Sequence, residues 1–311
     1  MSESPPSNAA AEQADLTELL AEVRHIEVQS KRLVASALAG GYRSVFRGSG
    51  LEFDEVREYV SGDDPRSVDW NVTARAGKPF IKKFVDEREL TVMFLLDLSP
   101  SMDQGFGHYT LRQMAARIAG CLALSAVRNN DKVGLLGFSD QIDKYVPARK
   151  GSRHALSIIR DCLALRGSGQ GSNLSAALDH AGSAMRGHST LFLLSDFCAD
   201  GWQQSLTLCS KRHDLIAVRL LPPEFEDLPD GLVRVIDPET QQAQWLDGGS
   251  AQVREQYRQR MQHWQDQVAH QLRSAKVDCM DVRIPRERDP DAVARPIHRF
   301  FRMREQRGGH G

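Results

Sequence analysis

The chain has 311 residues, of which 41% are hydrophobic and 26% are charged, as in ordinary globular proteins. The formal net charge of −1 provides no overall field that would attract nucleic acid or an anionic membrane. The longest apolar runs, such as residues 92–96, are far too short to cross a bilayer. We therefore expect no nucleic-acid partner and no membrane insertion.

The N-terminus is predicted to consist of a tail followed by a helix. Residues 1–15 are small, polar and acidic and lack the basic start and apolar core of a signal peptide, so we expect a disordered tail. Apolar residues at helical spacing predict an amphipathic helix from Leu16 to Leu38. This helix and the segment that follows it make up the predicted N-terminal region, residues 16–89.

Residues 42–89 are rich in turn signals and charges, which predicts a small β-rich extension. Partial alternation of apolar residues favours a hairpin formed by Val68–Arg75 and Pro79–Val85. Charge-rich loops taken alone are usually only solvated, so a structural role is the simpler interpretation. The alternative is a surface that ties the extension to the next domain and docks a partner, with the candidate residues Arg57, Arg66, Asp69, Trp70 and Arg75.

The most informative stretch runs from Thr91 to Met102. It begins with an apolar run containing β-branched and aromatic residues, which predicts a buried strand of a parallel sheet. Asp97, Ser99 and Ser101 then follow at every second position. Open α/β sheets bind ligands outside the carboxyl ends of their strands, so these three oxygen donors mark a candidate site.

Strands and helices are predicted to alternate through the rest of the chain. Strands are expected at residues 132–138, 142–146, 190–197, 215–221 and 277–284; helices at 111–128, 153–165, 175–185, 202–211, 252–274 and 292–304; and a peripheral hairpin at 232–236 and 242–246. The alternation predicts a doubly wound, mostly parallel α/β sheet in residues 90–285. A C-terminal helix and tail are expected in residues 286–311.

Three loops at strand ends are predicted to converge, and they carry only oxygen ligands. The first loop carries Asp97, Ser99 and Ser101, the glycine-rich second loop carries Ser172, and the third strand ends at Asp196. Such donors suit Mg²⁺, with Mn²⁺ as the alternative, rather than zinc or copper. Because hydroxyls are neutral, they would leave the metal partly unneutralised, with a position open for a carboxylate of another molecule.

These motifs resemble those of a known family. Asp97-Leu98-Ser99-Pro100-Ser101, Ser172 and Leu193-Leu194-Ser195-Asp196 resemble the metal-ion-dependent adhesion site of a von Willebrand factor A domain, with Ser172 where that family usually has threonine. The upstream block, Gly62-Asp63-Asp64-Pro65-Arg66 followed by Asp69-Trp70, resembles the bacterial family known as domain of unknown function fifty-eight. The combined resemblance covers residues 33–284.

The resemblance implies a von Willebrand factor A-like, Rossmann-like domain in residues 90–285. It also implies one Mg²⁺ held directly or through water by Asp97, Ser99, Ser101, Ser172 and Asp196. The implied function is that of a non-enzymatic interaction module, an adaptor or co-chaperone of a MoxR-type AAA+ ATPase. We expect an acidic residue of such a partner to bind the ion.

The alternative function is a metal-dependent phosphohydrolase, or another hydrolase, that uses Asp97. Phosphotransferases with a strand-end aspartate need a second acid two positions later, where this chain has Ser99. The glycine-rich loop lacks the lysine of a P-loop, and no Gly-x-Ser-x-Gly motif surrounds Ser99 or Ser195. We therefore expect no enzymatic activity.

Two smaller features complete the sequence-based expectations. Basic and aromatic residues alternate in residues 298–304, which favours a docked terminal helix over a nucleic-acid-binding segment. The five cysteines form no Cys-x-x-Cys pair and are interpreted as reduced thiols of a cytoplasmic protein.

Overall fold

The computed structural model describes residues 19–31, 52–60, 63–64, 68–85, 89–105, 107–185, 187–236 and 243–308. The chain divides into two compact units, of which the smaller is Arg47–Leu90 and the larger contains the remaining residues. The predicted tail at residues 1–15 lies outside the described residues, as does the candidate docking residue Arg66. No helix of the described residues has both the length and the hydropathy needed to cross a membrane.

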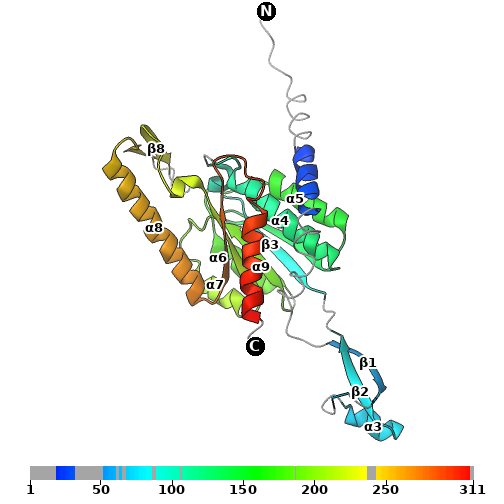
Figure 1. Ribbon diagram of the computed structural model, residues 1–311. Coiled ribbons are helices and arrows are strands. Elements are labelled where there is room, and N and C mark those ends of the chain that lie inside the picture. The colour runs from blue at the N-terminus through cyan, green and yellow to red at the C-terminus, as the bar shows by residue number, and fades with distance from the viewer. Residues whose placement is uncertain are drawn as a thin grey trace, which may run out of the picture. The chain divides into compact units, whose positions relative to one another are not determined.

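The larger unit is built on a six-stranded sheet in the order β10-β7-β6-β3-β4-β5 (Figure 1). All neighbouring pairs are parallel except β4 and the edge strand β5, which are antiparallel. The strands are β3 (Thr91–Asp97), β4 (Lys132–Phe138), β5 (Ile142–Arg149), β6 (Thr190–Ser195), β7 (Asp214–Leu221) and β10 (Asp278–Arg283). This order confirms the predicted doubly wound, mostly parallel α/β fold.

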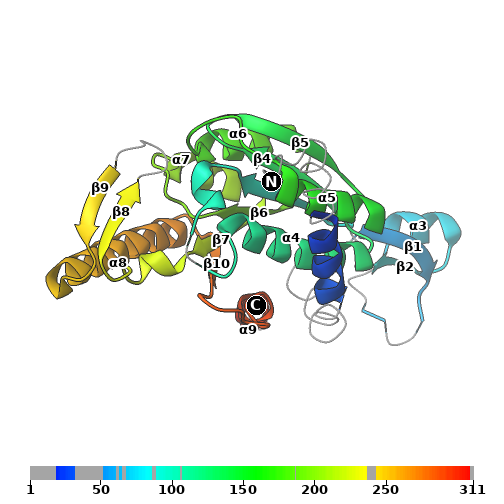
Figure 2. The same cartoon turned by 90° about the horizontal axis from the view of Figure 1, so that it is seen from above.

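Helices cover both faces of the sheet (Figure 2). They are α4 (Leu111–Arg128), α5 (Ser152–Ala164), α6 (Leu174–Ala184), α7 (Gln203–Ser210), α8 (Ala251–Ser274) and α9 (Ala294–Gly308). Alternate strand residues such as Met93 and Leu95 form one continuous core with α6, α7 and the C-terminal part of α8. On the opposite face α4 packs against α5, while α9 packs beside β10.

The direction in which the sheet is wound changes between β3 and β6. The strand β4 follows β3 in the chain and lies on one side of it, whereas β6 lies on the other side. The parallel register pairs Leu96 with Leu194, so the next residues along the two strands are Asp97 and Ser195. Ligand sites of doubly wound sheets lie at such a switch point, outside the carboxyl ends of the strands.

A helix of residues 19–31 packs on α4, which confirms part of the predicted N-terminal helix; the rest of that prediction lies outside the described residues. Ile26 is buried against Gly120, where an added Cβ would lie 2.6 Å from the Ile26 side chain. The Ser30 hydroxyl and the Cys121 thiol are 3.1 Å apart, within hydrogen-bonding distance. The absence of a side chain at Gly120 therefore lets this helix approach α4 closely.

The smaller unit corrects the predicted hairpin of Val68–Arg75 with Pro79–Val85. The antiparallel partner of β2 (Phe80–Val85) is β1 (Glu52–Glu58), and Trp70–Ala76 forms the helix α3. The Asp69 carboxylate caps this helix by accepting from the backbone N–H groups of its first turn. Gly77 ends the helix with a left-handed φ of 71°. These two local signals outweigh the weak alternation on which the hairpin prediction depended.

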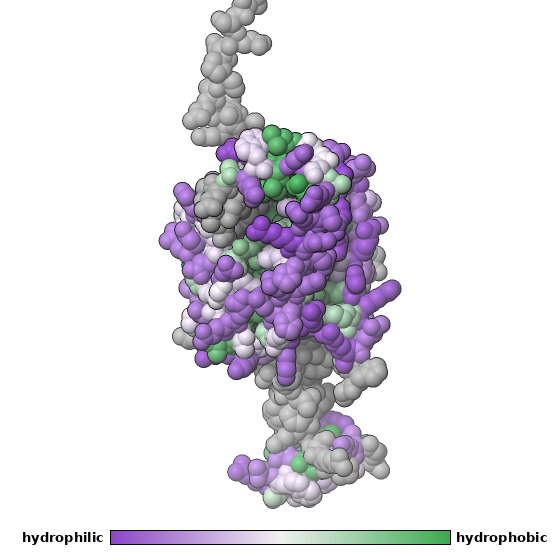
Figure 3. All heavy atoms as spheres, turned by 90° about the vertical axis from the view of Figure 1, so that its left-hand side faces the viewer, coloured by the Kyte–Doolittle hydropathy of each residue, from purple (hydrophilic) through white to green (hydrophobic). Residues whose placement is uncertain are grey.

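A peripheral hairpin lies between β7 and α8. Its strands β8 (Leu232–Ile236) and β9 (Ala243–Asp247) pair antiparallel, which confirms the predicted hairpin. The short 3-10 helix η3 (Pro223–Phe225) connects β7 to this region, and both η3 and β9 contact α8. The face seen in Figure 3 is mostly hydrophilic, as expected for a region dominated by the polar helix α8, with only small hydrophobic patches.

Candidate metal centre

The first loop of the candidate site follows β3 and is held by a hydrogen bond to the side chain of Asp97. The Asp97 Oδ1 atom accepts a hydrogen bond of 2.9 Å from the backbone N–H of Ser99. The chain then enters the 3-10 helix η2 (Pro100–Asp103), and the hydroxyl oxygens of Ser99 and Ser101 lie 3.1 Å apart. Asp97 and Ser99 are buried, whereas Ser101 is half-buried. This loop therefore presents three oxygen donors along one short segment.

The glycine-rich loop brings the second part of the site to the same place. The Ser172 hydroxyl donates a hydrogen bond of 2.8 Å to Asp97 Oδ2. The loop lies close to the first one because Gly167 has no side chain: an added Cβ would be 2.5 Å from the carbonyl oxygen of Leu98. Asn173 then caps α6 by accepting from the Ala176 N–H at 3.0 Å. The loop is thus held at both ends, next to Asp97.

The third loop begins at the end of β6 and contains Asp196, which is 2% exposed. The backbone N–H of Cys198 donates to Asp196 Oδ1 at 3.0 Å, and Ser101 lies close enough to this carboxylate to lower its pKa. The structure therefore brings together all five predicted ligand residues.

Ser195 also belongs to this cluster, although it is not among the ligand residues predicted from the sequence. Its hydroxyl donates to Asp97 Oδ2 at 2.7 Å and accepts from the Phe197 N–H at 2.9 Å. The residue stands directly before Asp196, but its role depends on the register that places it beside Asp97. No signal in the sequence fixes that register, so Ser195 could not be identified from the sequence alone.

The two carboxylates destabilise each other's charged form. Burial, and then repulsion from Asp196, raises the pKa of Asp97 to about 6, although hydrogen bonds from Ser99 and Ser195 oppose the shift. Burial also raises the pKa of Asp196, against hydrogen bonds from Cys198 and Ser101. A cation placed between two such groups would relieve both the repulsion and the loss of solvation.

The oxygen set fits a hard divalent cation. Adjacent ligands roughly 2.0–2.1 Å from an octahedral Mg²⁺ are about 2.9 Å apart. The oxygen distances of the two hydroxyl hydrogen bonds, 3.1 Å between Ser99 and Ser101 and 2.8 Å between Ser172 and Asp97, are compatible with this spacing. Among the described residues no group of three or more His, Cys, Asp or Glu could hold a metal.

A buried arginine supports the first loop and was not predicted. Arg112 on α4 is 2% exposed, and its guanidinium donates to the Leu165 carbonyl oxygen and, at 2.5 Å, to Asp103. It therefore links η2 to the end of α5. Asp103 lies in this ion pair at the edge of the loop.

The candidate docking residues of the smaller unit have separate local roles. Arg57 forms a two-bond contact with Asp63, with N–O distances of 2.9 and 2.7 Å. Asp69 caps α3, Trp70 is 73% exposed and Arg75 is exposed in the last turn of the helix. Their proposed tie to the larger unit stays a prediction.

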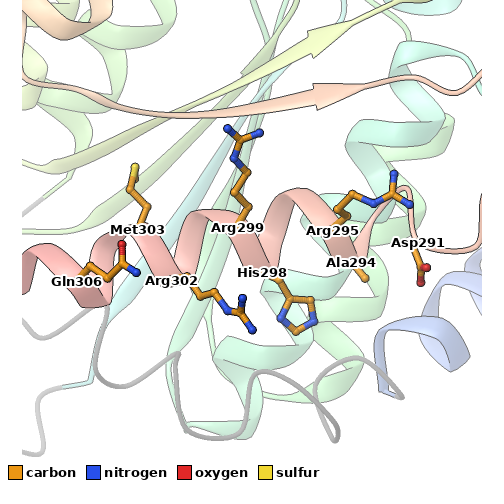
Figure 4. A pocket seen from close by; sticks show the side chains of 8 residues that line it. All are labelled: Asp291, Ala294, Arg295, His298, Arg299, Arg302, Met303 and Gln306. Atoms are coloured by element: carbon orange, nitrogen blue, oxygen red, sulfur yellow. The ribbon is translucent and has the colours of Figure 1, made fainter.

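The C-terminal helix α9 is docked, as expected. Ile297, Phe300 and Phe301 are buried, while Arg304 pairs with both Asp214 and Asp278. A cavity runs along the exposed side of α9 (Figure 4). Its described lining consists of Asp291, Ala294, Arg295, His298, Arg299, Arg302, Met303 and Gln306, none of which belongs to the candidate metal centre.

Comparison with known proteins identifies the family. Residues 55–267 match the family described as "Protein of unknown function DUF58", and because this is more than half of the chain, the protein belongs to that family. It is 29% identical over 229 residues to the uncharacterized proteins Rv1480 of Mycobacterium tuberculosis (strain ATCC 25618 / H37Rv) and Mb1516 of Mycobacterium bovis (strain ATCC BAA-935 / AF2122/97). The matched region covers 73% of this chain and 72% of each relative.

Similar solved structures have low sequence identity. BatB from Bacteroides thetaiotaomicron is 14% identical with a TM-score of 0.45, and the match covers 70% of this chain and 99% of that one. The SpRpn10 VWA domain is 11% identical with a TM-score of 0.37, and the match covers 68% of this chain and 94% of that one. Because both TM-scores are below 0.5, the fold class rests on the sheet order and register described above.

Proposed function

We propose that the protein is a non-enzymatic, Mg²⁺-dependent protein-interaction module. In this proposal one Mg²⁺, or Mn²⁺, is held by Asp97, Ser99, Ser101, Ser172 and Asp196, directly or through water. The convergence of two buried carboxylates with three hydroxyls at one switch point of the sheet carries the proposal. Because the hydroxyls are neutral, an acidic side chain of a protein partner completes the coordination.

The proposed partner is a MoxR-type AAA+ ATPase in the cytoplasm, for which this protein acts as an adaptor or co-chaperone. This part of the proposal depends on the sequence resemblance and on membership of the DUF58 family. We propose that Asp97 serves as a ligand rather than as a nucleophile for group transfer. Both carboxylate oxygens of Asp97 already accept hydrogen bonds, from Ser99, Ser172 and Ser195.

Magnesium titration tests the proposed ligand set. We expect saturable heat when Mg²⁺ is titrated into metal-stripped protein, and loss of that heat in Asp97→Ala, because the variant lacks one of only two carboxylates in the cluster. The control is Asp200→Ala, which removes an exposed acid of the same β6 loop and should leave binding unchanged. Equal Mg²⁺ binding by Asp97→Ala and the wild type would contradict the site.

Partner capture tests the function of the bound ion. A MoxR-type AAA+ ATPase should be retained by the wild type in Mg²⁺ and released by chelator, and Asp97→Ala should not retain it. Retention by Asp97→Ala in chelator at wild-type strength would exclude an ion bridge. A Mg²⁺-dependent phosphatase activity that disappears in Asp97→Asn would instead support the hydrolase alternative.

The smaller unit provides a second proposed docking surface around Trp70. Trp70→Ala should change the free energy of unfolding by less than about 0.5 kcal/mol, because the side chain is 73% exposed. We expect the same variant to weaken capture of the ATPase, measured as an increase in Kd. Trp245→Ala, at a 60% exposed tryptophan of β9, is the matched control. Unchanged capture by Trp70→Ala would rule out this role.

A further inference from the structure

A cavity of about 420 Å³ opens directly beside the candidate metal centre. Two of the proposed ligand residues, Ser101 and Asp196, form part of its wall. The cavity is therefore continuous with the place where a partner carboxylate would reach the ion. Its volume is in the range of pockets that bind small ligands.

The wall away from the metal centre is mainly apolar and comes from three elements. Phe225 and Leu228 extend from η3 and the loop after it, Val233 and Val235 come from β8, and Tyr257 comes from α8. Leu228 is 5% exposed, and the two valines are half-buried. An occupant of this part of the cavity would therefore exchange water for apolar contacts.

Packing behind the wall keeps this part of the cavity in place. The Phe225 ring stands edge-on to Trp264 of α8, with the ring centroids 5.2 Å apart. Burial, followed by the nearby Glu224 carboxylate, raises the pKa of Tyr257 to about 12, so its phenol stays protonated and can donate a hydrogen bond. The exposed Arg234 adds a positive charge to the hairpin side of the wall, opposite in sign to the carboxylates of Asp196 and Glu224.

We propose, on the basis of the proposed function, that this cavity holds a large apolar side chain next to the acidic residue that binds the ion. The recognised partner segment then combines an Asp or Glu with a neighbouring Leu, Ile, Met, Phe or Trp. This inference depends on the continuity between the polar part of the wall, at the metal centre, and its apolar part. One peptide can reach the ion with its acidic side chain and fill the apolar part with another side chain only if these two residues are close together in the peptide. The hairpin and α8 thus select among acidic segments.

A phage-displayed library of random heptapeptides tests the proposal on the immobilised full-length protein. With Mg²⁺ present, we expect enrichment of peptides in which an acidic residue lies within two positions of a large apolar residue. Chelator and Asp97→Asn should each remove this enrichment. Enrichment of acidic residues without apolar neighbours would overturn the inference while leaving the proposed function intact. The absence of any Mg²⁺-dependent acidic enrichment would overturn both.

A matched pair of variants on β8 tests the cavity itself. Val233→Asp places a charge in the apolar wall, whereas Leu232→Asp places the same charge at a neighbouring residue that is 69% exposed and does not line the cavity. Selection on Val233→Asp should keep the acidic preference and lose the apolar one, and selection on Leu232→Asp should keep both. Tyr257→Ala is a second wall variant, for use if Val233→Asp lowers the Tm.

Fluorescence anisotropy of a selected peptide gives the size of the effect. Replacing its apolar residue with serine should weaken binding to the wild type roughly tenfold to a hundredfold, the range expected for burying one large apolar side chain. The same replacement should have little effect on binding to Val233→Asp. Equal losses in both proteins would overturn the inference. A second result would also overturn the inference: Val233→Asp changes the oligomeric state of the protein but not the peptides that it selects. The cavity would then be occupied by a second copy of the chain rather than by a partner peptide.

Discussion

Replacing Asp97 with asparagine is expected to stabilise the metal-free protein at neutral pH. Burial and the neighbouring Asp196 raise the pKa of Asp97 from 3.8 to about 6, so its charge is unfavourable in the folded state. A shift of this size corresponds to about 3 kcal/mol, an upper limit because the hydroxyls that donate to Asp97 must rearrange around an amide. Such a gain is unusual for a change at a fully buried polar residue.

The pH dependence of unfolding gives the sign of this effect. Because the pKa of Asp97 is higher in the folded state, the folded protein binds more protons than the unfolded chain between about pH 4 and pH 6. The stability of the metal-free wild type should therefore fall as the pH rises through this window. Urea unfolding in chelator at pH 4, 5, 6 and 7 measures this dependence. The unfolding free energy of Asp97→Asn should exceed that of the wild type by an amount that grows as the pH rises from 4 to 6. A variant that is less stable than the wild type at pH 7 would contradict the argument.

Magnesium should reverse the order of the two proteins. A ligand that binds only the folded state adds about 4.1 kcal/mol to the unfolding free energy at one thousand times its Kd, which exceeds the gain of about 3 kcal/mol expected for Asp97→Asn. The wild type should gain this stability in Mg²⁺, whereas Asp97→Asn should gain none. Asp200→Asn, which changes an exposed acid near the same site, should behave like the wild type.

Replacing Trp202 with alanine is expected to cause the largest loss of stability, about 3–5 kcal/mol. The side chain is 1% exposed, and its ring packs edge-on to Phe197 with the centroids 5.5 Å apart. The indole Nε1 donates to the Ala199 carbonyl oxygen at 2.8 Å, so the substitution also leaves that acceptor without its partner. Urea unfolding at pH 7 measures the loss.

The same substitution should weaken Mg²⁺ binding, because Trp202 fixes the loop that begins at Asp196. Trp245→Ala is the matched control: this tryptophan is 60% exposed, and its loss should change the unfolding free energy by less than about 0.5 kcal/mol. Trp202→Phe should retain part of the packing and an intermediate Mg²⁺ affinity. Equal losses of unfolding free energy in Trp202→Ala and Trp245→Ala would show that burial of the tryptophan does not determine the loss of stability.

The fold of the larger unit could be predicted because its strands are continuous apolar runs. The limits of β4 and α4 agree with the sequence-based limits, since burial on both sides leaves a clear pattern. In the smaller unit α3 has only seven residues and buries none of them, so no apolar periodicity marks it. There the capping residue Asp69 and the terminating Gly77 were better guides than hydropathy.

The candidate site shows a similar division. Asp97, Ser172 and Asp196 could be brought together from sequence because strand ends of a doubly wound sheet meet at one edge. Ser195 could not, because its contact with Asp97 requires the register of β3 against β6. Nor could Arg112, whose partners at Asp103 and Leu165 lie 9 and 53 residues away in the chain.

The ion pairs of Arg304 have a practical consequence for experiments on this protein. Asp214 and Asp278 are the first residues of β7 and β10, so Arg304 fixes the end of α9 at the amino edge of the sheet. The candidate metal centre lies at the carboxyl edge. An affinity tag or surface linker attached at the C-terminus is therefore carried away from the ion. Immobilisation through that end should leave the binding edge facing the solution.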